Sequence, residues 1–174
     1  MTKNNGNRTI EDVTIAFRNF AGKEDLYNRE GNRNFAIFLD ETQAQQFSDD
    51  GWNVKYLKAR EEGDEQQAYL QVAISYKNRP PKIGMVTSRV ISYLDEAQLE
   101  ILDWVDIETA DITINPYTWA VSEKTGVKAY LATLFIKIEE DYLQEKWTNI
   151  VENKQLGSAS DPMVIEGDYE VRND

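Results

Sequence analysis

Aromatic and basic side chains are interleaved in the segment 51–92. This segment carries seven Lys and Arg residues against four acids, which gives it a net charge of +3. Its large aromatic residues are Trp52, Tyr56, Tyr69 and Tyr76. The bases of single-stranded nucleic acid stack on exposed aromatic faces, while lysine and arginine follow the phosphates. The combination predicts a surface that binds a single strand, with burial in the core as the alternative for any one ring.

Two further groups of the same residue types lie outside that segment. One is a polar, turn-rich stretch at 21–34, and the other flanks a predicted hairpin turn at 121–126. In the first stretch, Gly31 lies between two arginines and permits a tight backbone approach. The predicted nucleic-acid-binding residues are Tyr27, Arg29, Arg33, Trp52, Lys55, Tyr56, Lys58, Tyr76, Lys77, Arg79, Lys82, Tyr117, Trp119 and Lys128.

The residue types exclude several kinds of catalysis. Neither histidine nor cysteine occurs among the 174 residues, so the chain has no imidazole base, no thiolate nucleophile and no ligand set for a structural zinc. Acids at Asp103, Asp106, Glu108 and Asp111 are numerous enough for a magnesium-dependent nuclease. Acids at the end of a helix are more often a solvated face, however, and no lysine stands among them to help activate water. We therefore expect a binding protein and not an enzyme, with no metal and no cofactor.

The acidic residues are segregated along the chain. Overall, 31 acids against 19 bases give a net charge of −12, and this average argues against a nucleic-acid partner. Seven acids and no base fall in 95–111, and ten acids against three bases fall in 139–174. The basic, aromatic segment is thus flanked by two acidic ones, and the average charge conceals it.

Hydrophobic periodicity predicts mostly β-structure. Val13, Ile15 and Phe17 alternate with polar or small residues, as on one face of a half-buried strand. Further strands are predicted at 35–39, 52–60, 69–77 and 83–94, at 112–119 with a break at Pro116, and at 127–138. Helices are predicted from Asp40 to about 48, from Asp95 onward, and at 141–153. This order predicts a mainly β fold with short helices (β-rich α+β), built as a partly closed, mostly antiparallel barrel.

The chain is short enough to form one domain. We expect a flexible N-terminal arm at 1–9, a domain at 10–153 that includes the C-terminal helix, and an acidic tail at 154–174. No apolar run is long enough to cross a membrane, and no signal peptide is recognisable, so we expect a cytoplasmic protein without a membrane partner. A homodimer could form through 127–138, taken as an edge strand, or through the helix at 141–153.

Several segments together resemble a family of phage and prophage single-stranded DNA-binding proteins. They are 27–35 (YNREGNRNF), 51–58 (GWNVKYLK), 69–76 (YLQVAISY), 79–83 (RPPKI), 116–119 (PYTW) and 126–131 (GVKAYL). No single piece is diagnostic, but they follow one another in order, and the resemblance covers roughly residues 10–145. It implies an OB-fold core, binding of single-stranded DNA without sequence preference, and a role in phage replication or recombination in the cytoplasm of the infected bacterium.

Proteins of this family often carry an acidic C-terminal tail that recruits replication partners and competes with DNA for the basic groove. The resemblance assigns this role to Asp161, Glu166, Asp168, Tyr169 and Glu170. Many such tails end in an aromatic or apolar residue, whereas this chain ends at Asp174. Tyr169 and Val171, which lie a few residues before Asp174, could replace that terminal aromatic or apolar residue.

An alternative function rests on the acids at 95–111. An acidic surface of this kind suits a phage interaction protein, either a DNA mimic or an inhibitor of a host defence or replication protein. The net charge favours this alternative, and the basic, aromatic strands favour DNA binding.

Overall fold

The computed structural model describes residues 6–59, 61–77, 79–88, 90–139 and 150–151. Residues 1–139 make up one compact unit and residues 140–174 a second. In the second unit only Ile150 and Val151 are described, and both are helical. The rest of the helix predicted at 141–153 and the whole tail predicted at 154–174 lie outside the described residues.

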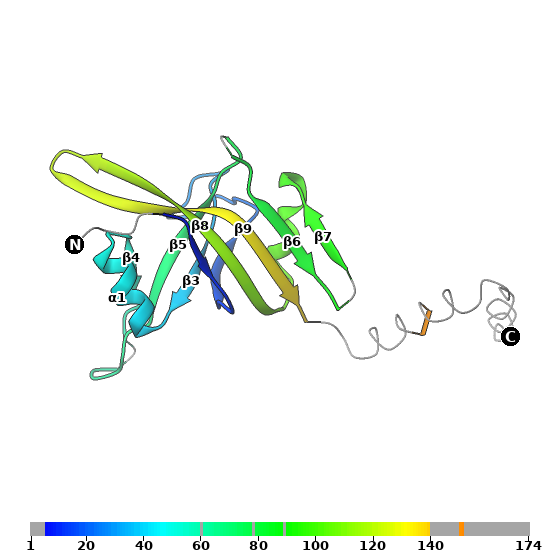
Figure 1. Ribbon diagram of the computed structural model, residues 1–174, viewed down its shortest axis with the longest axis horizontal. Coiled ribbons are helices and arrows are strands. Elements are labelled where there is room, and N and C mark those ends of the chain that lie inside the picture. Colours follow the sequence, from blue (N-terminus) through cyan, green and yellow to red (C-terminus); the bar gives the residue numbers. More distant parts are fainter. Residues whose placement is uncertain (1–5, 60, 78, 89, 140–149, 152–174) are drawn as a thin grey trace, which may run out of the picture. The chain divides into compact units, whose positions relative to one another are not determined.

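The described part of the first unit consists of nine strands and two short helices (Figure 1). The strands are β1 Arg8–Ile10, β2 Ile15–Asn19, β3 Arg33–Leu39, β4 Val54–Tyr56, β5 Ala68–Ile74, β6 Lys82–Val86, β7 Ile91–Leu94, β8 Ile107–Val121 and β9 Lys124–Ile138. The helices are the α-helix α1, Glu41–Asp49, and the 3-10 helix η1, Glu96–Asp103. This confirms the predicted β-rich fold with short helices. None of the described helices is long and apolar enough to cross a membrane.

The strands form one mixed sheet in the order β1-β8-β9-β5-β3-β2, with β4 paired to β5 and β6 paired to both β7 and β9. The described pairings between these strands are antiparallel except β5 with β9 and β6 with β9, which are parallel. An isolated parallel bridge also joins Trp52 to Val127. The sheet is not a closed ring. Its two end strands, β1 and β2, are however separated in sequence only by residues 11–14. The segment 8–19 therefore borders both β8 and β3, as in an OB-fold-like, partly closed barrel.

The bend between β1 and β2 is held by specific hydrogen bonds. Asp12 has a positive φ of 54°, and its amide donates to the Asp111 carboxylate at 2.9 Å. After the bend, the Val13 amide donates to the Ala110 carbonyl at 2.8 Å, and the Phe38 amide donates to the Thr14 carbonyl at 3.0 Å. Within a few residues the chain thus changes from pairing with β8, in β1, to pairing with β3, in β2. This change brings the two ends of the sheet together.

Arg18 and Asp103 hold the end of η1 against β2; we call this pair the η1 clamp. The Asp103 carboxylate accepts the backbone N–H groups of Phe20 at 2.7 Å and Ala21 at 3.0 Å. In return, the Arg18 guanidinium donates to the carbonyls of Leu102 and Val105 at 2.9 and 2.6 Å. The clamp fixes the point at which the chain leaves β2 and enters the loop at 20–32.

Three local predictions differ from the structure. The segment predicted as one strand at 83–94 is the hairpin β6–β7, because the Thr87 amide turns back to the Val90 carbonyl at 3.0 Å. The strand β8 continues through Pro116, since the described part of β1 pairs with β8 only as far as Ile114 and an unpaired edge tolerates a proline. The segment 127–138 is not an edge strand, because β9 pairs with β8 on one side and with β5 and β6 on the other.

We expect the η1 clamp to contribute measurably to stability. Asp103→Ala leaves two backbone N–H groups without their charged acceptor and should lower the free energy of unfolding by about 2–3 kcal/mol. Asp106→Ala removes the same charge from an exposed neighbour and should change it by no more than about 0.5 kcal/mol. Urea denaturation of both variants gives the comparison. Equal stability of the two variants would contradict a structural role for Asp103.

Candidate nucleic-acid interface

A hollow of about 740 Å³ lies on the outer face of the sheet, and we call it the main groove. Its walls come from the loop at 20–32, from β5 and the residues that follow it, and from the β8–β9 hairpin. Six of the predicted residues line it: Tyr27, Arg33, Tyr76, Lys77, Trp119 and Lys128. The fold therefore brings together aromatic rings and ammonium groups that are up to about a hundred residues apart in the sequence.

The β8–β9 hairpin extends beyond the rest of the sheet (Figure 1). Its residues Trp119, Lys128 and Tyr130 line one wall of the main groove. Its register places Tyr117 opposite Lys128 and Trp119 opposite Gly126. Because side chains alternate between the two faces of a strand, Lys128 and Tyr130 share a face. The Lys128 ammonium lies 5.1 Å from the centre of the Tyr130 ring, and Tyr117 meets that ring edge-on at 5.9 Å.

The Trp119 indole lies directly over the backbone of Gly126. A Cβ added at Gly126 would come within 2.6 Å of the indole ring, closer than real side-chain contacts allow. Only a glycine opposite Trp119 therefore lets the indole approach the hairpin backbone this closely. In this position Trp119 lines the main groove.

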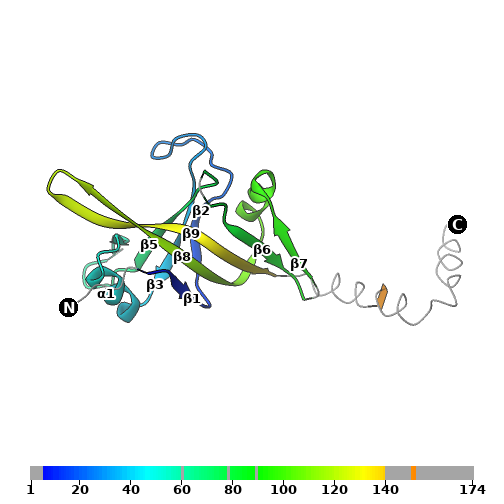
Figure 2. The same cartoon turned by 45° about the horizontal axis from the view of Figure 1, so that its top comes forward.

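The loop at 20–32 forms the opposite wall and projects from the sheet (Figure 2). Its conformation is organised by Asn28, whose amide group donates to the carbonyls of Lys23, Arg29 and Asn32 at 2.9, 3.1 and 3.0 Å. The Asn28 side-chain oxygen accepts a further bond from Asn34 on β3 at 3.0 Å. This network fixes the position of the neighbouring Tyr27, whose side chain is 95% exposed.

Arg33 lines the main groove but is already engaged within the protein. Its guanidinium donates to the Phe20 carbonyl at 2.6 Å and forms an ion pair with Glu96 at 3.5 Å. The first contact joins β3 to the loop at 20–32 and the second joins β3 to η1, so Arg33 has a structural part as well as a place in the groove. Arg29, the second arginine predicted in this loop, is exposed and does not line the groove.

Tyr76 lines the main groove beside Glu96. Burial raises the pKa of its phenol above the ordinary value of 10.0, and the negative charges of Glu96 and Asp95 raise it further, against an opposing effect of Arg33. The hydroxyl is buried and makes no hydrogen bond to any described residue. Tyr76 therefore carries a neutral phenol, and its hydroxyl is buried although the residue lines the groove.

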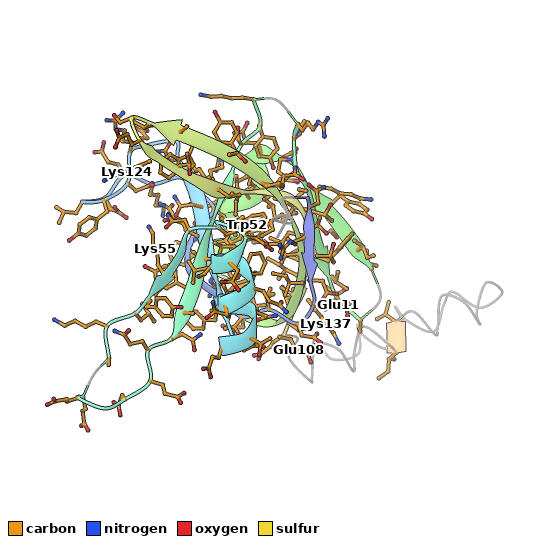
Figure 3. The ribbon with its side chains drawn as sticks, turned by 60° about the vertical axis from the view of Figure 1, so that its left-hand side comes forward. Glu11, Trp52, Lys55, Glu108, Lys124 and Lys137 are labelled. Atoms are coloured by element: carbon orange, nitrogen blue, oxygen red, sulfur yellow. The ribbon has the colours of Figure 1, made fainter. Side chains whose placement is uncertain are left out.

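The prediction that Trp52 stacks on bases is corrected by the structure. Its side chain is only 3% exposed and meets the Phe47 ring of α1 edge-on at 5.3 Å (Figure 3). The Arg8 guanidinium covers the two rings, at 4.9 Å from Phe47 and 5.8 Å from Trp52. Trp52 thus holds α1 on the sheet, because the start of its segment packs under that helix and not on the outer face.

The other predicted residues lie beside the main groove or away from it. Lys55 flanks it, since its ammonium donates at 3.3 Å to the side chain of Gln71, a lining residue. Lys82 lies on β6, where its ammonium stands 5.0 Å from the Tyr93 ring. The remaining four are exposed but do not line the groove: Tyr56, Lys58, Arg79 and Tyr117.

Sequence reasoning missed Tyr130, Gln71 and Asn53, which also line the main groove. A signal for Tyr130 was present, because it stands two residues after Lys128 and so faces the same side of the strand. Gln71 is exposed in the middle of β5, between the buried Leu70 and Val72. Its alternation with buried neighbours marks the outer face of the sheet.

The acids at 95–111 are largely engaged in contacts within the fold. Asp95 caps η1, Asp103 belongs to the η1 clamp, and Asp111 holds the bend at Asp12. Of the exposed acids, Glu108 pairs with Lys137 at 3.0 Å. The described residues contain no group of three or more acids placed to hold a metal ion. These contacts give the acidic segment a structural explanation and weaken the DNA-mimic alternative.

Comparison with protein-family models identifies a family for this chain. A family model described as a phage ssDNA-binding domain matches residues 1–167. Among solved structures, the single-stranded DNA-binding protein from bacteriophage Enc34 in complex with ssDNA has a TM-score of 0.51 at 7% identity, with 78% of this chain and 88% of that chain covered. A C-terminal truncation of the Enc34 protein has a TM-score of 0.49 at 8% identity, with the same coverage. A search of curated proteins gave no match.

Proposed function

The chain belongs to the phage ssDNA-binding domain family, and from this premise we propose that it binds single-stranded DNA along the main groove without sequence preference. The observation that carries the proposal is the convergence of Tyr27, Trp119 and Tyr130 with Lys77 and Lys128 in one hollow. Aromatic faces and cations in one groove are what a flexible polyanion with exposed bases requires. Stacking on each ring is worth about 1–3 kcal/mol per base.

Each wall of the main groove has its own part in the proposed complex. The β8–β9 hairpin offers the Trp119 indole as a stacking face and the Lys128 ammonium as a phosphate contact. The loop at 20–32 offers the almost fully exposed Tyr27 ring from the other side. Between them, the exposed Lys77 ammonium can contact a phosphate. Rings and cations read neither base identity nor base order, so binding is general for single strands.

The proposed biological role is in phage DNA replication or recombination inside the bacterial host. Single strands exposed in these processes need a protein that covers them and performs no chemistry on them. The family description names DNA binding, which supports a binding activity without catalysis.

The acidic tail is proposed to modulate this binding and to recruit replication or recombination proteins. Its residues Asp161, Glu166, Asp168, Tyr169 and Glu170 lie outside the described residues. An acidic segment tethered to the same chain has a high effective concentration near the cationic groove. DNA, which offers more charge and bases that stack, displaces it.

Removing the groove cations should weaken binding in a salt-dependent way. The double variant Lys77→Gln, Lys128→Gln loses two phosphate contacts, so its plot of log affinity against log salt should be shallower by about 1.4. Affinity for oligo-dT at roughly 0.1 M salt should fall by about 10- to 30-fold. Fluorescence anisotropy at several salt concentrations measures both quantities.

The control for this variant is Lys137→Gln. Lys137 pairs with Glu108 and lies at the other end of the molecule from Lys55 and Lys124 (Figure 3). Its loss should leave the salt dependence unchanged. If the double variant has the same salt dependence as the control, the main groove is not the phosphate path.

The Trp119 platform should depend on Gly126. Gly126→Ala places a methyl group in the indole and should tilt the ring, which weakens oligo-dT binding by roughly 5- to 20-fold. Gly84→Ala introduces similar crowding, 2.8 Å from the Phe135 ring, but outside the main groove. It should bind DNA as the parent protein does. Thermal denaturation confirms that both variants are folded, and equal affinity of the two would remove Trp119 as a stacking platform.

Deleting residues 157–174 should tighten binding at low salt, because the groove loses its tethered competitor. The difference should vanish as salt screens the tail from the groove. A full-length variant with the tail acids changed to amides should behave like the deletion, which separates charge from length. Affinity that is equal to or weaker than that of the parent protein at low salt would contradict a competing tail.

A further inference from the structure

A second hollow, of about 510 Å³, continues from the main groove, and we call it the side groove. The two hollows have four lining residues in common: Tyr27, Asn28, Asn34 and Gln71. Shared walls on the loop at 20–32, on β3 and on β5 mean that the hollows are adjacent parts of one path across the outer face. A strand that passes Tyr27 in the main groove therefore meets the side groove next.

The side groove is lined by exposed aromatic rings that the packing of the fold does not require. The Phe17 side chain is 56% exposed and that of Trp104 is 68% exposed, and both line the hollow together with Tyr27. Single exposed apolar residues are common on protein surfaces. Here, by contrast, three large rings surround one hollow, and that hollow is continuous with a groove that already contains Trp119 and Tyr130. Such a cluster differs from singly exposed apolar residues.

Phe17 is presented outward by a strained backbone. It has a positive φ of 50°, a conformation that is an outlier for a bulky side chain, and it lies where the β2–β3 register shifts between Ala16 and Asn19. The ring meets Tyr69 edge-on at 5.6 Å and Phe38 at 6.3 Å. A regular strand would have turned Phe17 toward the same side as Ile15. The strain therefore has one visible result, an aromatic face on the side groove.

Trp104 is held in place from both sides. It is the C-cap residue of η1, directly after Asp103 of the η1 clamp. The Lys23 ammonium lies 5.1 Å from the centre of its ring and 3.9 Å from the Glu100 carboxylate. The ring is positioned by a clamped helix end and stays largely exposed although the Lys23 ammonium lies over it, so it has the two features that stack a base and hold its phosphate.

We propose that the side groove is a second subsite for the same DNA strand, in which bases beyond those in the main groove stack on Phe17 and Trp104 and Lys23 contacts a phosphate. The inference rests on the proposed function and adds to it the path and length of the bound strand. Three other charged residues of the side groove already make contacts within the protein. Arg18 and Asp103 form the η1 clamp, and the Asp25 carboxylate accepts a hydrogen bond from the Tyr27 amide at 2.8 Å. Because the clamp engages Arg18, Lys23, which is itself paired with the exposed Glu100, is the lining cation that meets a phosphate, so stacking dominates and the subsite adds little salt dependence.

The test measures affinity for oligo-dT as its length increases from about 4 to about 16 nucleotides, the range of site sizes for OB-folds. Trp104→Ala and Phe17→Gly should match the parent protein on the shortest oligonucleotides that bind. On the longest they should bind roughly 5- to 100-fold more weakly, because bases in the side groove have lost their platforms. Trp104→Phe keeps an aromatic face, so its affinity should increase with oligonucleotide length almost as much as that of the parent protein.

Two further variants make the outcome specific. Tyr93→Ala removes a ring that is 54% exposed on β7 and lines neither groove, and it should follow the parent protein at every length. Trp119→Ala should lose affinity at all lengths, because it alters the main groove. If Trp104→Ala and Phe17→Gly gain affinity with length as the parent protein does, the side groove is not a subsite, whatever Trp119→Ala shows. If only Trp119→Ala matches the parent protein, Trp119 is not a stacking platform and the side groove stands.

Fluorescence and stability distinguish binding from folding. In a Trp119→Phe background, long oligo-dT should quench the remaining emission more than short oligo-dT does, and the added Trp104→Phe change should abolish that difference. Phe17→Gly relieves the strain of the positive φ, so its thermal midpoint should equal or exceed that of the parent protein. Its affinity for oligo-dT should nevertheless no longer increase with oligonucleotide length as that of the parent protein does. Emission that responds equally to short and long strands would overturn the proposal.

Discussion

Strand β9 is the constraint on which the rest of the structure depends. It pairs with β8 along its whole length, with β5 at Ala129 and Tyr130, and with β6 from Thr133 to Lys137. Its buried residues are 127, 129 and 131 in the first half and 134 and 136 in the second, so the alternation changes phase near the register shift opposite Thr113 and Ile114. Each half of β9 therefore has one side buried in the core. The first half directs Lys128 and Tyr130 to the groove and the second half carries the β6–β7 hairpin.

The sequence was sufficient to predict the kind of fold and much of one groove, because both depend on local pattern. Alternation located most strands, and interleaved lysines and aromatics located Lys77, Trp119 and Lys128. Trp52 was mispredicted because its burial depends on α1, which packs over it from outside its own strand. Phe17 was grouped with Val13 and Ile15 on one face, since no period-two pattern reveals a residue with positive φ. Trp104 belongs to no periodic segment, and only the tertiary fold brings it beside Lys23.

The distribution of charge also becomes clear only in three dimensions. Along the chain, the acids at 95–111 form a block with no base. In the fold, this block meets cations and backbone donors from the N-terminal strands: Asp103 binds the chain at Phe20, and Glu96 pairs with Arg33. An acidic helix beside a DNA-binding groove would repel phosphate if its charges were free. Here several of them are satisfied by the loop that forms the groove wall, so the acids help to build the site.

The same contacts explain how the fold tolerates strain at its outer face. A bulky residue at positive φ costs about 1–3 kcal/mol, a substantial part of the roughly 5–15 kcal/mol by which a domain is stable. Phe17 keeps this conformation because its flanks are fixed: Ile15 and Ala16 pair with β3, and Arg18 and Phe20 are bound to the end of η1. With both flanks held, the chain between them is constrained to this conformation. The η1 clamp therefore sets the backbone of Phe17 and the position of Trp104 together, which couples the two rings of the side groove through one set of hydrogen bonds.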